Sequence, residues 1–174
     1  ISACLVGSEM CIRDRVMLVR DADSRIHWKD RWAIREFLSS PQVAHTIRDH
    51  KEHTAHIMGG LWGLKKAAGV SMGSLYANYT EDMSRGHRVA HDQNFLADAL
   101  YPLVFSRMLI HRCNGPRFMG EVFVTDFPFA WSNDVFCGRI ETNYVDYPQP
   151  PPIPRSVLVP YKATRPIPHF LANL

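Results

Sequence analysis

Short apolar runs alternate with stretches of helical periodicity between residues 16 and 125, and this alternation constrains the fold more than any other feature. Residues 16–19 form a β-branched-rich run that predicts a buried strand. Residues 28–39 have the spacing of an amphipathic helix that Pro41 would stop. The predicted apolar stripe is Trp28, Trp32, Ala33, Phe37 and Leu38, and the predicted solvent face is Lys29, Asp30, Arg31 and Arg35.

The remaining elements continue the alternation. Residues 43–47 predict a second strand, and residues 71–80 predict a short helix capped by Ser71. A longer helix is expected over residues 92–105, with Asp92 as its N-cap and with Pro102 as a residue that ends or kinks it. Residues 108–111 and 122–125 are further candidate strands. Strands that alternate with helices predict an α/β domain.

Three regions differ in composition. Residues 5–15 read like a translated reading frame of a sequencing-library adaptor, so residues 1–15 are treated as non-native and left out of fold reasoning. Residues 16–147 carry the alternating elements and are long enough for one domain. Eight of the twelve prolines lie between Pro148 and Pro168, which predicts an extended proline-rich tail over residues 148–174.

Charge and hydropathy narrow the class of ligand. The net charge of +3 suits a small phosphate-bearing ligand, and the sequence lacks the Lys/Arg runs of a nucleic-acid surface. No apolar run approaches the roughly 18 residues of a membrane span, so we expect no membrane segment in this chain. Outside residues 1–15 only Cys113 and Cys137 remain, and two isolated cysteines predict ordinary buried thiols.

Asp21 and Asp23 follow the first predicted strand and are separated by one residue. Two carboxylates at this spacing can present oxygens to Mg²⁺ or Mn²⁺, which would bridge them to a diphosphate. Ligands of α/β sheets bind beyond the carboxyl ends of strands, which is where this loop is expected. Arg20 and Arg25 flank the pair and are candidates to bind phosphate oxygens.

Arg48-Asp49-His50, with His53, forms a second polar cluster. Its simplest interpretation is an arginine–carboxylate pair that positions a loop. His50 and His53 are three residues apart, as in some metal sites. A metal-dependent phosphoesterase is therefore an alternative function, and it requires both histidines to converge with Asp21 and Asp23 on one ion.

Further candidates lie in a glycine-rich segment and in the long helix. Gly59-Gly60-Leu61-Trp62-Gly63 is too rich in glycine for a helix and predicts a loop or strand edge where the backbone closely approaches another group. Gly59, Gly60 and an exposed Trp62 would suit the apolar face of a sugar. Asp92 and Gln93 offer a carboxylate and an amide to hydroxyl groups. His111, at the end of a candidate strand, is a candidate metal ligand.

The order of these motifs resembles a known family. Arg-Asp-x-Asp-Ser-Arg, Arg-Asp-His-x-x-His, Gly-Gly-Leu-Trp-Gly-Leu-Lys and His-Asp-Gln-x-Phe-Leu together resemble GT-A-fold glycosyltransferase-like proteins of the nucleotide-diphospho-sugar transferase superfamily. The resemblance spans about residues 16–125. It implies a partial GT-A (Rossmann-like) domain with a mixed sheet flanked by helices. The strand–helix units that would bind the nucleotide base are missing before Asp21, which predicts an N-terminally truncated fragment that is inactive alone.

The resemblance also implies roles for the site residues. Asp21 and Asp23 would bind Mn²⁺ or Mg²⁺ and the donor diphosphate, with His111 as third metal ligand. Gly59 and Gly60 would line the sugar pocket, with Gln93 beside the transferred sugar. The implied reaction transfers a glycosyl group from a nucleotide-sugar donor to a carbohydrate or other hydroxyl acceptor; for an inverting course Asp92 and Asp49 are both candidate bases. A non-catalytic carbohydrate-binding domain is a further alternative.

Overall fold

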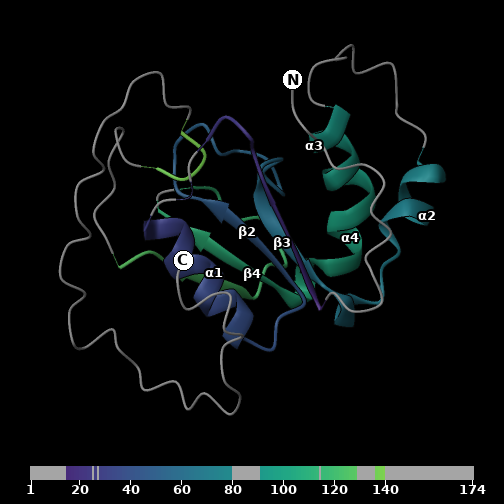
Figure 1. The fold of residues 1–174 in the computed structure, drawn as a ribbon, viewed down its shortest axis with the longest axis horizontal. Coiled ribbons are helices and arrows are strands. Elements are labelled where there is room, and N and C mark those ends of the chain that lie inside the picture. The colour runs from purple at the N-terminus through teal and green to yellow at the C-terminus, as the bar shows by residue number, and fades with distance from the viewer. Residues whose placement is uncertain are drawn as a thin grey trace.

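A computed structural model describes residues 15–24, 26, 28–79, 91–113, 115–128 and 136–139. The adaptor-like residues 1–14, Arg25 and the proline-rich tail lie outside these ranges, so the predictions made for them are not addressed by the structure. Five strands and the helices between them form an α/β fold (Figure 1). The predicted class, a mixed sheet flanked by helices, is confirmed.

The elements agree closely with the predicted alternation. The strands are β1 (Val16–Arg20), β2 (Ala44–Arg48), β3 (Leu61–Lys65), β4 (Met108–Arg112) and β5 (Phe123–Asp126). The helices are α1 (Trp28–Ser39), η1 (Lys66–Ala68), α2 (Met72–Ala77), α3 (His91–Phe95), η3 (Leu96–Leu100), α4 (Tyr101–Val104) and η4 (Phe105–Arg107). Ser71 caps α2 as predicted, because its side chain accepts a hydrogen bond from the backbone N–H of Ser74.

The sheet has the strand order β1-β3-β2-β4-β5. β3 runs antiparallel to both β1 and β2, whereas β2, β4 and β5 are parallel to one another. It follows that β1 points the same way as β2, β4 and β5. The carboxyl ends of these four strands and the amino end of β3 therefore lie at one edge of the sheet, which we call the carboxyl edge.

Two apolar clusters cover the two faces of the sheet. α1 packs on one face, and α3 and α4 lie on the other (Figure 1). The buried residues of the cluster beneath α3 and α4 are Ala44, Ile57, Trp62, Leu64, Phe95, Leu96, Leu100, Val104, Met108 and Ile110. The cluster on the α1 face consists of Ala33, Ile47, Leu61, Phe127 and Cys137. Because β3 contributes to both clusters, it is an interior strand, and the expectation of a strand edge was wrong.

β1 is an edge strand in the described sheet. All five of its residues are half-buried, since β3 is its neighbour on one side. The prediction of a fully buried strand was therefore wrong, although its position in the chain was right. This edge position leaves the loop after β1 accessible to solvent.

The solvent face predicted for α1 was wrong at two residues. Lys29 and Asp30 are both buried, with about 1% of each residue exposed. Each lies within ion-pair distance of a group from the sheet: Lys29 of Asp49, and Asp30 of Arg20. A charged residue is buried when a partner compensates its lost hydration, and here that partner comes from a distant part of the sequence.

The helix predicted over residues 92–105 is a continuous but irregular helical stretch. His91 already belongs to α3, so Asp92 lies within the first turn and is not the N-cap. The irregularity precedes Pro102: in η3 the backbone N–H of Tyr101 donates to the carbonyl of Leu96, five residues earlier. This π-helical turn accommodates a proline that cannot donate a backbone hydrogen bond, and the helix continues to Val104.

Candidate functional site

Polar residues collect at the carboxyl edge. Asp21 follows β1 directly, Asp49 follows β2 directly, and Gly59-Gly60 leads into β3 at the same edge. Ligands of α/β proteins commonly bind at this kind of edge, because strand ends place loops from different parts of the chain side by side. The carboxyl edge is therefore the candidate site.

Gly59 and Gly60 lie directly against two carboxylates. A Cβ atom added to Gly60 would stand 2.1 Å from the carboxyl carbon of Asp21. A Cβ atom added to Gly59 would stand 2.8 Å from an Oδ atom of Asp92 and 3.6 Å from Cγ of Gln93. Only glycine leaves room for these side chains. The glycine pair is thus the point where the loop after β1 meets the start of α3.

The electrostatics place Asp23 in the same group. The pKa of Asp21 is raised, chiefly by partial burial of its carboxyl group and then by the negative charges of Asp23 and Asp92, while Arg20 acts in the opposite direction. Asp21, Asp23 and Asp92 are all exposed residues. Three carboxylates therefore repel one another at the protein surface, and a bound cation would relieve that repulsion.

The loop that carries the first two carboxylates has a defined turn. The backbone N–H and the hydroxyl of Ser24 both donate to the carbonyl of Asp21, at 3.4 and 3.2 Å. This turn folds the segment back at Asp21 and keeps Asp23 close to it. Asp21, Asp23, Gly59, Gly60, Asp92 and Gln93 are thus the sequence-predicted site residues that the fold brings together.

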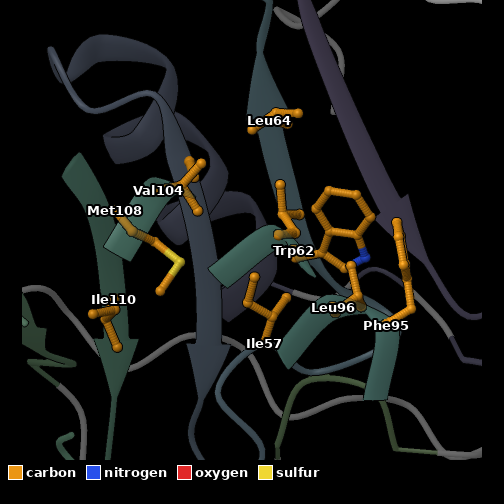
Figure 2. Close-up of a cluster of buried hydrophobic side chains, with 10 residues drawn as sticks. Ile57, Trp62, Leu64, Phe95, Leu96, Val104, Met108 and Ile110 are labelled. Carbon is orange, nitrogen blue, oxygen red and sulfur yellow. The ribbon is translucent and has the colours of Figure 1, made fainter. Parts of the chain in front are cut away.

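Trp62 does not belong to this group. Its indole is buried in the apolar cluster, on the face of β3 that α3 covers (Figure 2). Figure 2 shows the ring beside Phe95 and Leu96. The prediction of an exposed indole that stacks on a sugar was therefore wrong: the neighbouring glycines are at the edge of the site, but Trp62 lies further along the strand and anchors the helix to the sheet.

Arg20 is bound within the protein. Its guanidinium group contacts a carboxylate oxygen of Asp30 at 3.1 Å and donates to the backbone carbonyls of Val19 and Trp62 at 2.7 and 3.0 Å. The same group lies 3.4 Å from Nε2 of His45. These contacts correct the expectation that Arg20 is directed at a ligand phosphate. Arg25, the other arginine expected to contact phosphate, lies outside the described residues.

Asp49, one of two candidate bases, is enclosed. Its carboxylate accepts the backbone N–H of Cys137 at 3.0 Å, lies 3.3 Å from Nδ1 of His53 and lies 3.6 Å from Nζ of Lys29. Burial alone would raise the pKa of Asp49, but the contact with His53, the charge of Lys29 and the Cys137 N–H together lower it. A fully buried, ion-paired carboxylate cannot receive a proton from an acceptor hydroxyl, which leaves Asp92.

His111 was expected as the third metal ligand, and the structure places it elsewhere. Its side chain is fully buried under α1, where Nε2 lies 3.1 Å from a carboxylate oxygen of Glu36 and the ring contacts Trp32 edge to face. The ring of His45 lies 5.3 Å from that of His111. The strand-end position was right, but the side chain points into the α1 face of the sheet and not toward Asp21.

The phosphoesterase arrangement is not assembled either. His50 and His53 contact each other and both pack against the ring of Phe136. His53 faces Asp49. Over the described ranges, no group of three or more His, Cys, Asp or Glu residues is close enough to hold a metal ion. The four residues that this alternative requires are all described, and they do not converge.

Arg48 fulfils the expected positioning role with a partner that the sequence did not indicate. It forms a fully buried two-point ion pair with Glu121, at 2.7 and 3.0 Å, instead of pairing with Asp49. The guanidinium group also donates to the carbonyls of Ala55 and His56. These contacts hold the segment that leads into Gly59-Gly60. Glu121 lacked any sequence signal, because it is a single carboxylate in a loop 73 residues away.

Comparison with protein-family models, with curated proteins and with solved structures found no match. Within the described ranges, no helix is both long and apolar enough to cross a membrane.

Proposed function

We propose that this chain is a glycosyltransferase-like domain that binds a nucleotide-sugar donor through Mn²⁺ or Mg²⁺ at Asp21 and Asp23. The observation that carries the proposal is the meeting of Asp21 and Asp92 over Gly59-Gly60 at the carboxyl edge. Three of the four motifs on which the resemblance to GT-A-fold proteins rests contribute to this one place. Motifs that are 20 to 40 residues apart in sequence thus share one surface.

The residues present fit the proposed cation. The donor set consists of carboxylate oxygens, which Mg²⁺ and Mn²⁺ prefer, and the carboxylates repel one another without a cation. Mg²⁺ commonly keeps several waters and binds through one or two carboxylates plus substrate phosphates. A preassembled set of three protein ligands is therefore not required. When bound, the cation would supply Lewis-acid neutralisation of the leaving diphosphate.

Asp92 takes the role beside the acceptor. It is exposed, it lies against Gly59, and its side chain is close enough to Asp21 to influence the titration of that carboxyl. A general base must come within about 2.6–3.2 Å of the hydroxyl that it deprotonates. We propose Asp92 as this base for an inverting reaction, with Gln93 donating to or accepting from sugar hydroxyls next to it.

The test is release of nucleoside diphosphate from a panel of uridine and guanosine diphosphate sugars, with and without Mn²⁺. We expect Mn²⁺-dependent release that EDTA abolishes. Asp23→Ala should reduce release by at least 10²-fold, because a cation site with one carboxylate fewer loses most of its affinity. Glu52→Gln is the matched control, since it removes one carboxylate whose side chain is 75% exposed and lies outside the site.

The outcomes separate the alternatives. Release that is independent of metal, or that Asp23→Ala leaves unchanged, would contradict the proposal. Binding of the donor in the presence of Mn²⁺ without release of diphosphate would instead indicate a non-catalytic carbohydrate-binding domain. Hydrolysis of simple phosphate esters that survives Asp23→Ala would favour phosphoesterase chemistry elsewhere in the chain.

A further inference from the structure

The loop that carries Asp21 and Asp23 is closed at its base by one ion pair. Arg20 is the last residue of β1 and Asp30 lies in the first turn of α1, so the pair joins the two ends of the intervening loop. Nε of Arg20 lies 3.1 Å from the carboxylate of Asp30, and only 11% and 2% of the two side chains are exposed. The contact is therefore well shielded from water.

The Arg20 side of this pair is itself fixed. Its guanidinium group donates to the backbone carbonyls of Val19 and Trp62, which belong to adjacent strands. These bonds hold the planar guanidinium group against the sheet, and its remaining edge faces Asp30. The position of Asp30, and with it the start of α1, is consequently set by the ends of β1 and β3.

The preceding helical residue makes the equivalent contact with the next parallel strand. Lys29 lies 3.6 Å from Asp49, the residue directly after β2, and both side chains are 1% exposed or less. Two consecutive residues of α1 thus pair with the ends of two strands. The first turn of the helix spans the carboxyl edge beneath the loop of Asp21 and Asp23.

Stability alone does not account for this arrangement. Desolvation of both charges offsets much of their attraction, and replacing a buried ion pair by apolar side chains of similar volume is often neutral or stabilising. What an apolar pair cannot supply is direction, because a guanidinium–carboxylate contact fixes both distance and angle. The contact therefore serves to position something, and the segment that it closes carries the two proposed metal ligands.

We propose that Asp30, through Arg20, is the positioning residue that holds Asp21 and Asp23 in the geometry for binding the cation. This inference rests on the proposed metal-binding function. Asp30 does not contact the ligand. It fixes the exit of the loop relative to its entry, so that the turn at Ser24 directs the Asp21 carboxylate over Gly60.

The test compares Asp30→Asn with Asp126→Asn. Arg112 and Asp126 form an Arg–Asp pair at the same edge of the sheet, at 2.8 Å, with 30% and 68% of the side chains exposed and no loop of the site between them. The probe is Mn²⁺ alone, titrated by electron paramagnetic resonance of the free ion. We expect Asp30→Asn to weaken Mn²⁺ binding about tenfold or more, and Asp126→Asn to leave it unchanged.

Hydrogen exchange gives a second readout that does not depend on metal. In Asp30→Asn, amides of residues 21–26 should exchange faster, while amides of β2 and β4 keep the protection of the wild-type chain. Faster exchange throughout the sheet would show general destabilisation and would overturn a specific positioning role. Unchanged exchange in residues 21–26 together with unchanged Mn²⁺ affinity would overturn it as well.

A double variant covers the case in which Asp30→Asn does not fold. Arg20→Met with Asp30→Leu removes both charges and fills the space with apolar groups, so the thermal midpoint should return toward that of wild type. Mn²⁺ affinity should stay reduced. Recovery of Mn²⁺ affinity along with stability would refute the positioning role. If the wild-type chain itself binds no Mn²⁺, the proposed function fails and this inference with it; if wild type and all variants bind equally, only this inference fails.

Discussion

Gly60→Ala is the substitution with the most sharply defined effect on the site. The added methyl group would stand 2.1 Å from the carboxyl carbon of Asp21, against at least 3.4 Å for an ordinary contact, a shortfall of about 1.3 Å. The Asp21 side chain must therefore rotate away. Gly60 has no positive φ, so alanine fits its backbone without strain.

The expected magnitudes differ for stability and for activity. Restricting the unfolded chain stabilises the variant by about 0.4–1 kcal/mol, and a shifted rotamer of Asp21 costs about 0.5–1.5 kcal/mol, so stability should change by less than about 1 kcal/mol. A misplacement of about 1 Å costs roughly 10²-fold in rate. We expect Mn²⁺-dependent nucleotide release to fall by about that factor.

The assay pairs nucleotide release with urea unfolding, and Gly73→Ala is the matched control. A Cβ atom at Gly73, within α2, meets no atom within 4 Å, so this variant should gain about 0.5–1 kcal/mol of stability and keep its activity. The reasoning is refuted if folded Gly60→Ala releases nucleotide at the rate of wild type. It is also refuted if the variant loses several kcal/mol of stability, because the effect would then be structural.

Three further outcomes follow from the fold. Gly63→Ala should destabilise the chain by about 1–3 kcal/mol in urea unfolding, because its Cβ would meet side-chain and backbone atoms of β1 at 2.8 and 3.1 Å; a neutral effect would contradict the packing. Glu121→Gln should cost about 3–5 kcal/mol by the same assay, since it leaves the buried Arg48 guanidinium uncompensated, and a loss below 1 kcal/mol would argue against burial of that pair. Burial, then the neighbouring charges, hold the pKa of His45 well below 6.5, so the unfolded chain binds the proton first and stability should fall as the pH drops below about 6.5; His45→Leu should flatten this slope, and an unchanged slope would assign it to other groups.

The strands and helices were predictable because their patterns are local. Every described strand lies within two residues of its predicted position or, for β3, within the segment set apart by its glycines. The faces of these elements were less predictable. Trp62 alternates with Leu61 along β3, but both faces of this interior strand are covered, so alternation does not identify an exposed side.

Buried charges mark the limit of periodicity. Lys29 and Asp30 are polar residues beside an apolar stripe, and a helical pattern assigns such residues to solvent. Their partners, Asp49 and Arg20, are 20 and 10 residues away and belong to different strands. Pairing between distant residues depends on the topology of the sheet, which no local pattern encodes.

The candidate site was predictable to the extent that the motifs occur in a recognisable order. Asp21 and Asp92 are far apart in the sequence, and their spacing gives no reason for proximity. Their meeting depends on β3 lying between β1 and β2, which brings Gly59-Gly60 between the two carboxylates. His111 shows the converse: a histidine at a strand end can point to the face opposite the one expected, because one residue of register decides the face.

The pairing of β1 with β3 also has a consequence for the time course of folding. Arg20 pairs with Leu61, 41 positions later, so β1 finds no partner in the described sheet until β3 has been made. At the usual 5–20 residues per second of synthesis, this takes about 2–8 s. Closing so long a segment is entropically unfavourable and slow compared with forming α1. The carboxylate that opens the site is thus translated first among its partners, and it reaches its place only after a strand made much later has been inserted beside it.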